Sequence, residues 1–245
     1  MDGLGVEAIS ANYQVVVERI EDAARSVERS LKGIKLVVVT KGQPVESIHA
    51  AIQTGLRIFG ENYVQEGVNK ISQCTYQPDI EWHMIGHIQS RKAKDVCENF
   101  AWVQSLDSSK LAARLDRFAG ERDQTLPTLI EFNVSGEESK FGFQAWNESK
   151  WEDLLPDIGY ILQLKNLDIL GLMTMPPYLE DPEKVRPFFQ RLNRLRDYLT
   201  RIFPEANFRE LSMGMSNDYE IAVEENATIL RIGTAIMGAR MCALP

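Results

Sequence analysis

The sequence predicts an α/β fold: a single (β/α)8 TIM barrel spanning residues 1–245, with one extra helix at the N-terminus. About eight strand-length apolar runs alternate with helix-length amphipathic segments, which is the count that such a barrel needs. The length of 245 residues also agrees with the roughly 250 residues typical of this barrel. No low-complexity linker, charge block or Gly/Ser tract divides the chain, so one domain is expected.

The individual elements follow from apolar periodicity. Apolar residues recur at intervals of three and four over residues 6–31, which predicts a long amphipathic helix that stops before Gly33. Residues 35–40 are β-branched and almost continuously apolar, as is typical of a strand buried on both faces of a parallel sheet. Further strands are predicted at 56–60, 81–86, 102–106, 128–134, 167–175, 208–213 and 229–237. Helices are predicted between them at 45–54, 62–73, 91–99, 109–122, 147–155, 183–203 and 218–225.

Charge, cysteine and histidine content exclude several classes of function. The chain has 27 Lys and Arg against 35 Asp and Glu, a net charge of −8, which argues against a nucleic-acid partner. Cys74, Cys97 and Cys242 form no C-x-x-C pair, so reduced thiols are expected and disulfides and zinc are not. The three histidines form no His/acid pair at metal spacing, and no metal site is predicted. Without a signal-like or membrane-spanning apolar run, we expect a cytoplasmic protein.

In a TIM barrel the functional groups sit at the carboxyl ends of the strands. Polar residues and glycines gather at the predicted strand ends, whereas the strand interiors stay apolar. The candidate site residues at these ends are Lys41, Asn62, His83, Ser105, Asn133, Met173, Ser212, Gly214, Met215, Ser216, Gly233 and Thr234, with Arg231 just inside the last strand.

Lys41 is the candidate reactive group. Residues two apart share a face of a strand, so Val37 and Val39 would fill the barrel and Lys41 would cap it. A lysine held against apolar walls loses solvation, its pKa falls, and its neutral amine can form an imine with an aldehyde. The alternative is a solvated loop lysine.

Two glycine-containing segments suit a phosphate group. Residues 212–218 supply small residues, hydroxyls and an N-cap, so that backbone amides could converge on an anion. Gly233-Thr234 ends the eighth predicted strand, and barrels often hold phosphate with the loops after strands seven and eight. Ordinary turn chemistry is the alternative for each segment.

Arg231 and His83 are charged or polar residues within apolar strands. Beside a heterocycle nitrogen, Arg231 would act only as a donor and keep that nitrogen unprotonated; alternatively it forms a structural ion pair with Glu131 or Glu210. His83 is by default a core histidine with satisfied hydrogen bonds.

The chain resembles the pyridoxal phosphate homeostasis proteins, single-domain proteins built like the barrel domain of alanine racemase. The resemblance rests on seven ordered segments: VVVTK (37–41), FGENYVQE (59–66), WHMIGHIQ (82–89), Asn133 with ESKFG (138–142), GLMTMPP (171–177), LSMGMSND (211–218) and RIGTAIMG (231–238). Departures from the family pattern are Gly42-Gln43 after the lysine and Glu225-Asn226 before the last strand. Neither departure removes a candidate site residue.

The resemblance implies a fold-type III pyridoxal phosphate protein. It implies that Lys41 is the Schiff-base lysine, holding the cofactor as a covalent aldimine, and that Arg231 is the partner of the pyridine nitrogen. It further implies that Asn62, His83 and Met173 line the cofactor and that residues 212–216 with Gly233-Thr234 hold its phosphate. Ser105 and Asn133 belong to the same predicted cofactor-binding set.

The implied function is vitamin B6 homeostasis without substantial amino-acid turnover, possible partners being pyridoxal-phosphate-dependent apo-enzymes, and we expect a monomer. An amino-acid racemase is the alternative. Racemases of this design add a mostly β domain and use a tyrosine as a second base, for which the chain leaves no room after the eighth predicted strand. An arginine at the pyridine nitrogen would also weaken the cofactor as an electron sink. A class I aldolase using Lys41 would leave the resemblance unexplained.

Overall fold

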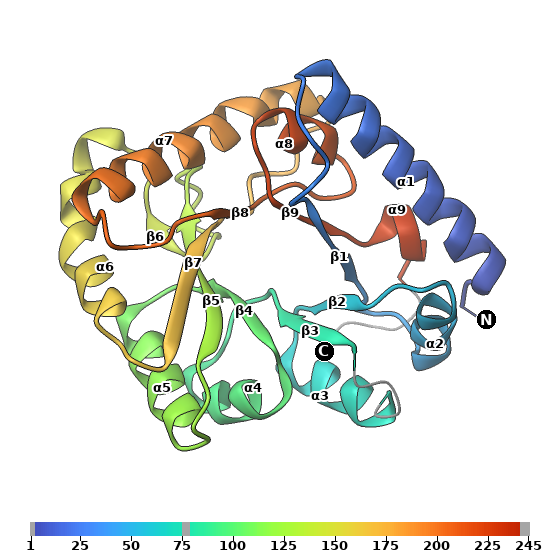
Figure 1. Cartoon of the computed structure of the whole chain (residues 1–245), viewed down its shortest axis with the longest axis horizontal. Helices are drawn as coiled ribbons and strands as arrows, with labels where there is room; N and C mark the ends of the chain where they lie inside the picture. The colour runs from blue at the N-terminus through green and yellow to red at the C-terminus, as the bar shows by residue number, and fades with distance from the viewer. Residues whose placement is uncertain (1–2, 75–78, 241–245) are drawn as a thin grey trace.

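The computed structural model describes residues 3–74 and 79–240 of the chain. Within this range eight parallel strands close into a barrel surrounded by helices (Figure 1). They are β1 (Lys35–Val39), β2 (Ile58–Glu61), β3 (Glu81–Met84), β4 (Trp102–Leu106), β5 (Leu126–Asn133), β7 (Leu167–Met173), β8 (Glu210–Ser212) and β9 (Ile229–Ile232). Neighbours pair in that order, and β9 pairs with β1. The predicted (β/α)8 barrel is confirmed.

The helices lie outside the barrel. They are α1 (Val6–Ser26), α2 (Val45–Gln53), α3 (Val64–Gln73), α4 (Ala93–Asn99), α5 (Ser109–Gly120), α6 (Leu155–Leu162), α7 (Arg186–Ile202), α8 (Tyr219–Glu224) and α9 (Thr234–Met237). Three 3-10 segments precede α4, α6 and α7: η1 (Ser90–Lys92), η2 (Glu148–Leu154) and η3 (Pro182–Val185). The extra helix α1 packs along the barrel against α2, α8 and α9 (Figure 1).

The helix α1 ends five residues earlier than predicted, and the reason is local. Glu28 has a φ of 54°, outside the helical region, and the Arg29 amide closes the end by donating to the Ala24 carbonyl at 2.8 Å. The Arg29 guanidinium then donates to the carbonyls of Val223 and Ala227. The chain therefore leaves the helix to tie α1 to α8.

Two predicted segments and one omission need correction. The strand predicted at 229–237 ends at Ile232, because the Gly233 carbonyl accepts the amides of Ile236 and Met237 and starts the short helix α9. The helix predicted at 147–155 is instead the 3-10 segment η2, and the α-helix α6 follows it to Leu162. A two-residue strand, β6 (Phe143–Gln144), pairs with β5 and has no apolar pattern that would predict it.

The core has two layers, which the alternation of side chains along β1 illustrates. Val37 belongs to the barrel interior together with Leu129, Leu170, Met173 and Ile229, and Val38 packs outward against the helices. This confirms that Val37 fills the barrel. Val39 and Lys41 follow Val37 at intervals of two residues, and both line a pocket at the carboxyl end of the barrel.

The structure also shows the state of two cysteines and whether any described helix could span a membrane. Cys74 and Cys97 are free, buried thiols, and burial raises the pKa of Cys97 to about 11. Cys242 lies outside the described residues. Over residues 3–74 and 79–240, no helix combines the length and apolar character that crossing a membrane requires.

Candidate functional site

A pocket of about 300 Å³ opens at the carboxyl ends of the strands. Seven predicted site residues meet there: Lys41, Asn62, Met215, Ser216, Arg231, Gly233 and Thr234. They come from segments after β1, β2 and β8, from β9 itself and from the start of α9. The structure thus joins residues that are up to 193 positions apart, Lys41 and Thr234, in one concave site.

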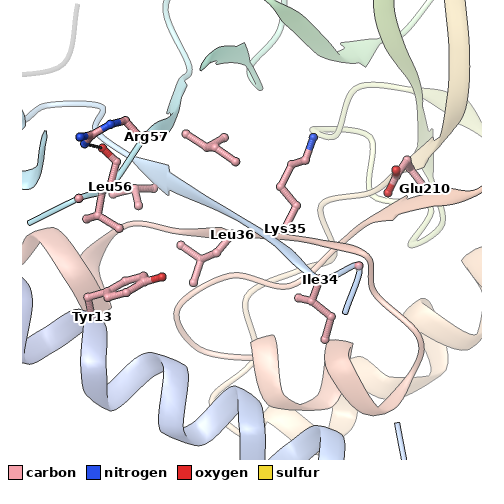
Figure 2. A pocket seen from close by; sticks show the side chains of 11 residues that line it. Tyr13, Ile34, Lys35, Leu36, Leu56, Arg57 and Glu210 are labelled. Carbon is pink, nitrogen blue, oxygen red and sulfur yellow. Dashed lines mark hydrogen bonds between the residues drawn. The ribbon is translucent and has the colours of Figure 1, made fainter. Parts of the chain in front are cut away.

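A larger pocket, about 550 Å³, lies at the opposite, amino ends of β1 and β2 (Figure 2). Its two labelled cations, Lys35 and Arg57, extend in different directions (Figure 2). Arg57 donates to the carbonyls of Ile52 and Leu56 and pairs with Asp79, and Lys35 lies over the Trp102 ring at 4.3 Å. Since these groups are already engaged, the carboxyl-end pocket is the better candidate site.

Lys41 is half-buried and lies two residues after the end of β1. In the described part of the chain, its ammonium makes no ion pair or hydrogen bond. Burial lowers the pKa of Lys41, and the charges of Arg240 and Arg231 lower it further, against the raising effect of Glu61 and Glu66. This environment favours a neutral amine and does not match a fully solvated loop lysine.

A buried ionic cluster, which the sequence did not reveal, holds both neighbours of this lysine. Lys70 Nζ donates to the Thr40 carbonyl at 2.6 Å, to Glu61 Oε1 at 2.8 Å and to Glu66 Oε1 at 2.6 Å. The Thr40 hydroxyl donates to Glu61 Oε1 at 2.6 Å, and the Gly42 amide donates to Glu66 Oε1 at 2.7 Å. The cluster therefore fixes the backbone on either side of the candidate reactive residue.

Arg231 is buried and meets neutral acceptors. Its Nη1 donates to Ser212 Oγ and its Nη2 donates to the Thr174 carbonyl at 2.8 Å. Burial lowers the pKa of Arg231 to about 10, opposed by the charges of Glu131 and Asp218. Neither carboxylate considered from the sequence pairs with it in the described chain, and Glu210 instead accepts from the Thr228 hydroxyl. Arg231 therefore keeps N–H groups available on the pocket side.

The two glycine-containing segments lie side by side. Ser216 Oγ accepts the Ala235 amide at 3.2 Å, which joins the loop after β8 to α9. Gly214 has a φ of +95°, and a Cβ there would lie 2.6 Å from the Ala222 Cβ, so this turn requires glycine. The amides of Ser216 and Thr234 have no acceptor in the described residues. They are free to bind an anion.

One carboxylate also borders these segments. Asp218 lines the pocket, is buried, and accepts the Met215 amide at 2.6 Å. Burial raises the pKa of Asp218. Its hydrogen bond closes the turn, so the carboxylate shapes the loop that presents the free amides.

Six predicted site residues lie behind the pocket rather than in its lining: His83, Ser105, Asn133, Met173, Ser212 and Gly214. Ser105 donates to the Gly86 carbonyl at 2.6 Å, and the Asn133 side chain holds the loop after β5 by accepting the Gly136 amide at 2.9 Å. Met173 belongs to the barrel core. Their direct contact with a ligand stays a prediction.

Four lining residues were not predicted from the sequence: Ile85, Met175, Tyr178 and Arg240. Asn217 and Asp218, which also line the pocket, belong to the predicted anion-binding segment 212–218. Met175 and Tyr178 flank Pro176-Pro177 after β7, and this turn, at the carboxyl end of a strand, is a signal that could have identified them. Arg240 follows the last helix, where no pattern in the sequence indicates that the chain returns to the site.

Comparisons with known proteins agree with this geometry. Residues 6–241 match the family model "Alanine racemase, N-terminal domain". The chain is 42% identical over 225 residues to the pyridoxal phosphate homeostasis protein of Aquifex aeolicus, covering 92% of this chain and 95% of that protein. It is 38% identical over 237 residues to the protein of the same name from Escherichia coli, with coverage of 95% and 97%.

Solved structures extend the comparison. PipY of Synechococcus elongatus, solved with pyridoxal phosphate bound, superposes with a TM-score of 0.78 at 33% identity, over 90% of this chain and all of that chain. Alanine racemase of Clostridium difficile shares the fold, with a TM-score of 0.70 at 14% identity over 95% of this chain and 60% of that one. The chain therefore belongs to the pyridoxal phosphate homeostasis protein family, whose barrel is that of the alanine racemase N-terminal domain.

Proposed function

We propose that this protein binds pyridoxal 5′-phosphate at the carboxyl-end pocket and serves in vitamin B6 homeostasis. The observation that carries the proposal is the position of Lys41, a partly desolvated amine that has no partner among residues 3–74 and 79–240. It shares its pocket with Arg231 and with the Ser216 and Thr234 amides, which have no acceptor in the same part of the chain. Lys41 is a nucleophile for an aldehyde, Arg231 is a hydrogen-bond donor for a ring nitrogen, and the two amides are donors for a phosphate. The cofactor bound to the relative PipY supports the assignment.

Each group has a distinct task in this proposal. Lys41 Nζ forms a Schiff base with the aldehyde carbon, and its lowered pKa increases the share of the reactive neutral amine. Arg231 donates to the ring nitrogen and keeps it unprotonated. The loop around Gly214 and the start of α9 hold the phosphate through backbone amides and the Thr234 hydroxyl.

We further propose that amino-acid turnover is not the function. An unprotonated ring nitrogen makes the cofactor a weaker electron sink for carbanion chemistry. A tyrosine does line the pocket, but Tyr178 is 76% exposed and has no hydrogen bond in the described chain. A base must be held within reach of the proton it transfers, and Tyr178 lacks such support. Delivery to apo-enzymes as a monomer is a further part of the proposal.

An absorbance spectrum of the purified, cofactor-loaded protein tests the binding proposal. A near-visible band that disappears on borohydride reduction is expected, with the reduced label on the peptide containing Lys41. The variant Lys41→Ala should lack the band, and Lys110→Ala, on the outer helix α5, should retain it. A label on Lys140 or another lysine would refute the assignment, and a protein without any band would favour the aldolase alternative.

A further inference from the structure

A chain of hydrogen-bonded polar side chains starts at the half-exposed Glu81, crosses the barrel interior through buried residues and ends at Arg231. Glu81 Oε2 lies 3.3 Å from His83 Nε2, and His83 Nδ1 lies 2.7 Å from Gln104 Nε2. Gln104 Oε1 lies 2.6 Å from Ser212 Oγ, which also contacts Arg231 Nη1. The strands β3, β4, β8 and β9 each contribute, and His83, Gln104 and Ser212 have no exposed surface. These hydrogen bonds connect the amino end of the barrel with the carboxyl-end pocket.

The direction of every hydrogen bond in this chain follows from the arginine. A guanidinium only donates, so Ser212 Oγ accepts from Arg231 and gives its own proton to Gln104 Oε1. The Gln104 amide nitrogen then donates to His83 Nδ1, which must carry no proton. The neutral imidazole therefore carries its proton on Nε2, where it donates to the Glu81 carboxylate.

The opposite orientation of the Gln104 amide leaves two groups unsatisfied. Its nitrogen would face Ser212 Oγ, and the hydroxyl proton would then have no acceptor among the described residues. Its oxygen would require a proton on His83 Nδ1, and the lone pair on Nε2 of the neutral ring would face the Glu81 carboxylate. Unpaired buried polar groups are costly, so the first orientation prevails.

The surroundings of His83 favour the neutral ring and hold it in place. The Trp102 ring stacks on it with centroids 5.2 Å apart, and Lys35 lies over the same indole at 4.3 Å. The charged groups that face the ring are Glu81 on its own strand and Lys35 on β1. Burial lowers the pKa of His83, with Lys35 acting in the same direction and Glu81 opposing.

We propose that Gln104 is a positioning residue for the cofactor: held by the Nε2–H tautomer of His83, it fixes the Ser212 hydroxyl and so aims the Arg231 guanidinium at the ring nitrogen. The inference rests on the proposed function, because it assumes that Arg231 meets that nitrogen. Two neutral oxygens, Ser212 Oγ and the Thr174 carbonyl, hold the guanidinium. No carboxylate partner in the described chain neutralises it, so its charge remains directed at the pocket.

Cofactor binding by Gln104→Leu tests the role. Dissociation constants are measured for pyridoxal 5′-phosphate and for its deaza analogue, in which carbon replaces the ring nitrogen. Gln104→Leu should weaken binding of the natural cofactor by about tenfold, the scale of one charge-assisted hydrogen bond, and should change binding of the analogue by less than about twofold. Gln190→Leu, which removes an exposed amide on α7, should leave both constants unchanged.

The variant Arg231→Met separates the inference from the function on which it rests. If Arg231→Met discriminates between the two ligands but Gln104→Leu weakens both equally, Gln104 has only a structural role and the inference is overturned. If Arg231→Met also weakens both equally, the contact with the ring nitrogen is wrong, and the proposed function loses that part.

Nitrogen-15 NMR provides a second readout, which requires no substitution in the buried hydrogen-bond chain itself. The chain has three histidines, so the ring signals of His83 can be assigned by comparison with His49→Gln and His87→Gln variants. We expect the neutral Nε2–H tautomer between pH 6 and pH 8. A proton on Nδ1 in this range would reverse the direction of the hydrogen bonds between His83, Gln104 and Ser212 and overturn the inference.

Discussion

Lys70 and Glu61 form an ion pair of 2.8 Å whose side chains are 6% and 0% exposed, next to the segment after β1 that carries Lys41. Glu66 and the Thr40 carbonyl complete three acceptors, one for each proton of the ammonium. Burial raises the pKa of Glu61, and Lys70 opposes that effect. Through Lys70, the Glu61 and Glu66 side chains hold the backbone on both sides of Lys41: Glu61 accepts the Thr40 hydroxyl and Glu66 accepts the Gly42 amide.

The first prediction is that Lys70→Met strongly destabilises the protein. Removing one partner of a buried pair leaves an uncompensated charge, at a cost of about 3–5 kcal/mol in the free energy of unfolding. Urea denaturation followed by circular dichroism measures it. Lys92→Met breaks a more exposed pair with Asp95 and should cost no more than about 1 kcal/mol. Similar losses for the two variants would show that burial of the Lys70 pair has no special importance.

The second prediction concerns pH and Glu131. This carboxyl is buried, its Oε2 has no partner in the described chain, and burial together with Asp107 raises its pKa to about 7 from 4.5. Because the folded-state pKa is the higher one, the carboxyl stabilises the fold fully below about pH 4.5 and loses that contribution as pH rises through 7. At 1.36 kcal/mol per pH unit, the loss is at most about 3 kcal/mol.

Glu131→Gln should therefore gain stability relative to the unmodified protein above pH 7 and lose that advantage near pH 4.5. Unfolding curves at several pH values measure the difference. Glu148→Gln serves as the control, because Arg194 lowers the pKa of Glu148 and gives its pH dependence the opposite sign. An advantage of Glu131→Gln that did not change with pH would contradict the raised pKa.

Much of the fold could be predicted because strands and helices have different apolar periods. Val37 inside and Val38 outside show why a nearly continuous apolar run belongs to a strand with two buried faces. Residues 234–237 could not be assigned in the same way, because Thr-Ala-Ile-Met also suits a strand. Their helical turn depends on the direction of the Gly233 carbonyl, which a sequence pattern does not reveal.

The candidate site was partly predictable for a related reason. Lys41 and Thr234 could be placed because strand ends converge at one face of a barrel, and this depends only on topology. Lys70 could not, because Glu66 and Lys70 are four residues apart, the spacing of an ordinary solvated helix pair. Their burial results from the tertiary packing of α3 against β2 and α4. The Gln104 chain likewise depends on side chains from four strands.

The third prediction concerns the Thr234 hydroxyl, which we expect to bind the phosphate together with the backbone amides of Ser216 and Thr234. Thr234→Val keeps the shape of the side chain and removes its hydroxyl, which costs about 1–3 kcal/mol if it donates to a charged phosphate. The dissociation constant for pyridoxal 5′-phosphate should rise much more than that for pyridoxal. Thr200→Val, on the exposed face of α7, should change neither constant. Equal losses for both ligands would show that Thr234 does not contact the phosphate.

The last prediction is that the cofactor-loaded protein does not turn over amino acids at a rate of about 1 s⁻¹ or more, the low end of ordinary enzymes. Arg231 faces the pocket with its charge unpaired by carboxylates in the described chain, so the ring nitrogen should remain unprotonated. Tyr178, the tyrosine in the pocket lining, is 76% exposed and unsupported by hydrogen bonds among the described residues. A positioned base contributes about 10²–10⁴-fold, and its absence should leave racemisation slow.

Tyr178→Phe provides the decisive comparison. If the protein is a carrier, this variant should bind pyridoxal 5′-phosphate as the unmodified protein does and should transfer it equally well to an apo-enzyme. Incubation with each L-amino acid, followed by assay of the D-isomer, keto acid and carbon dioxide, measures turnover in both proteins. Turnover above about 1 s⁻¹ that Tyr178→Phe abolishes would support the racemase alternative. Since this variant removes only the phenolic hydroxyl and keeps the shape of the side chain, such a loss would identify Tyr178 as the proton-transfer base.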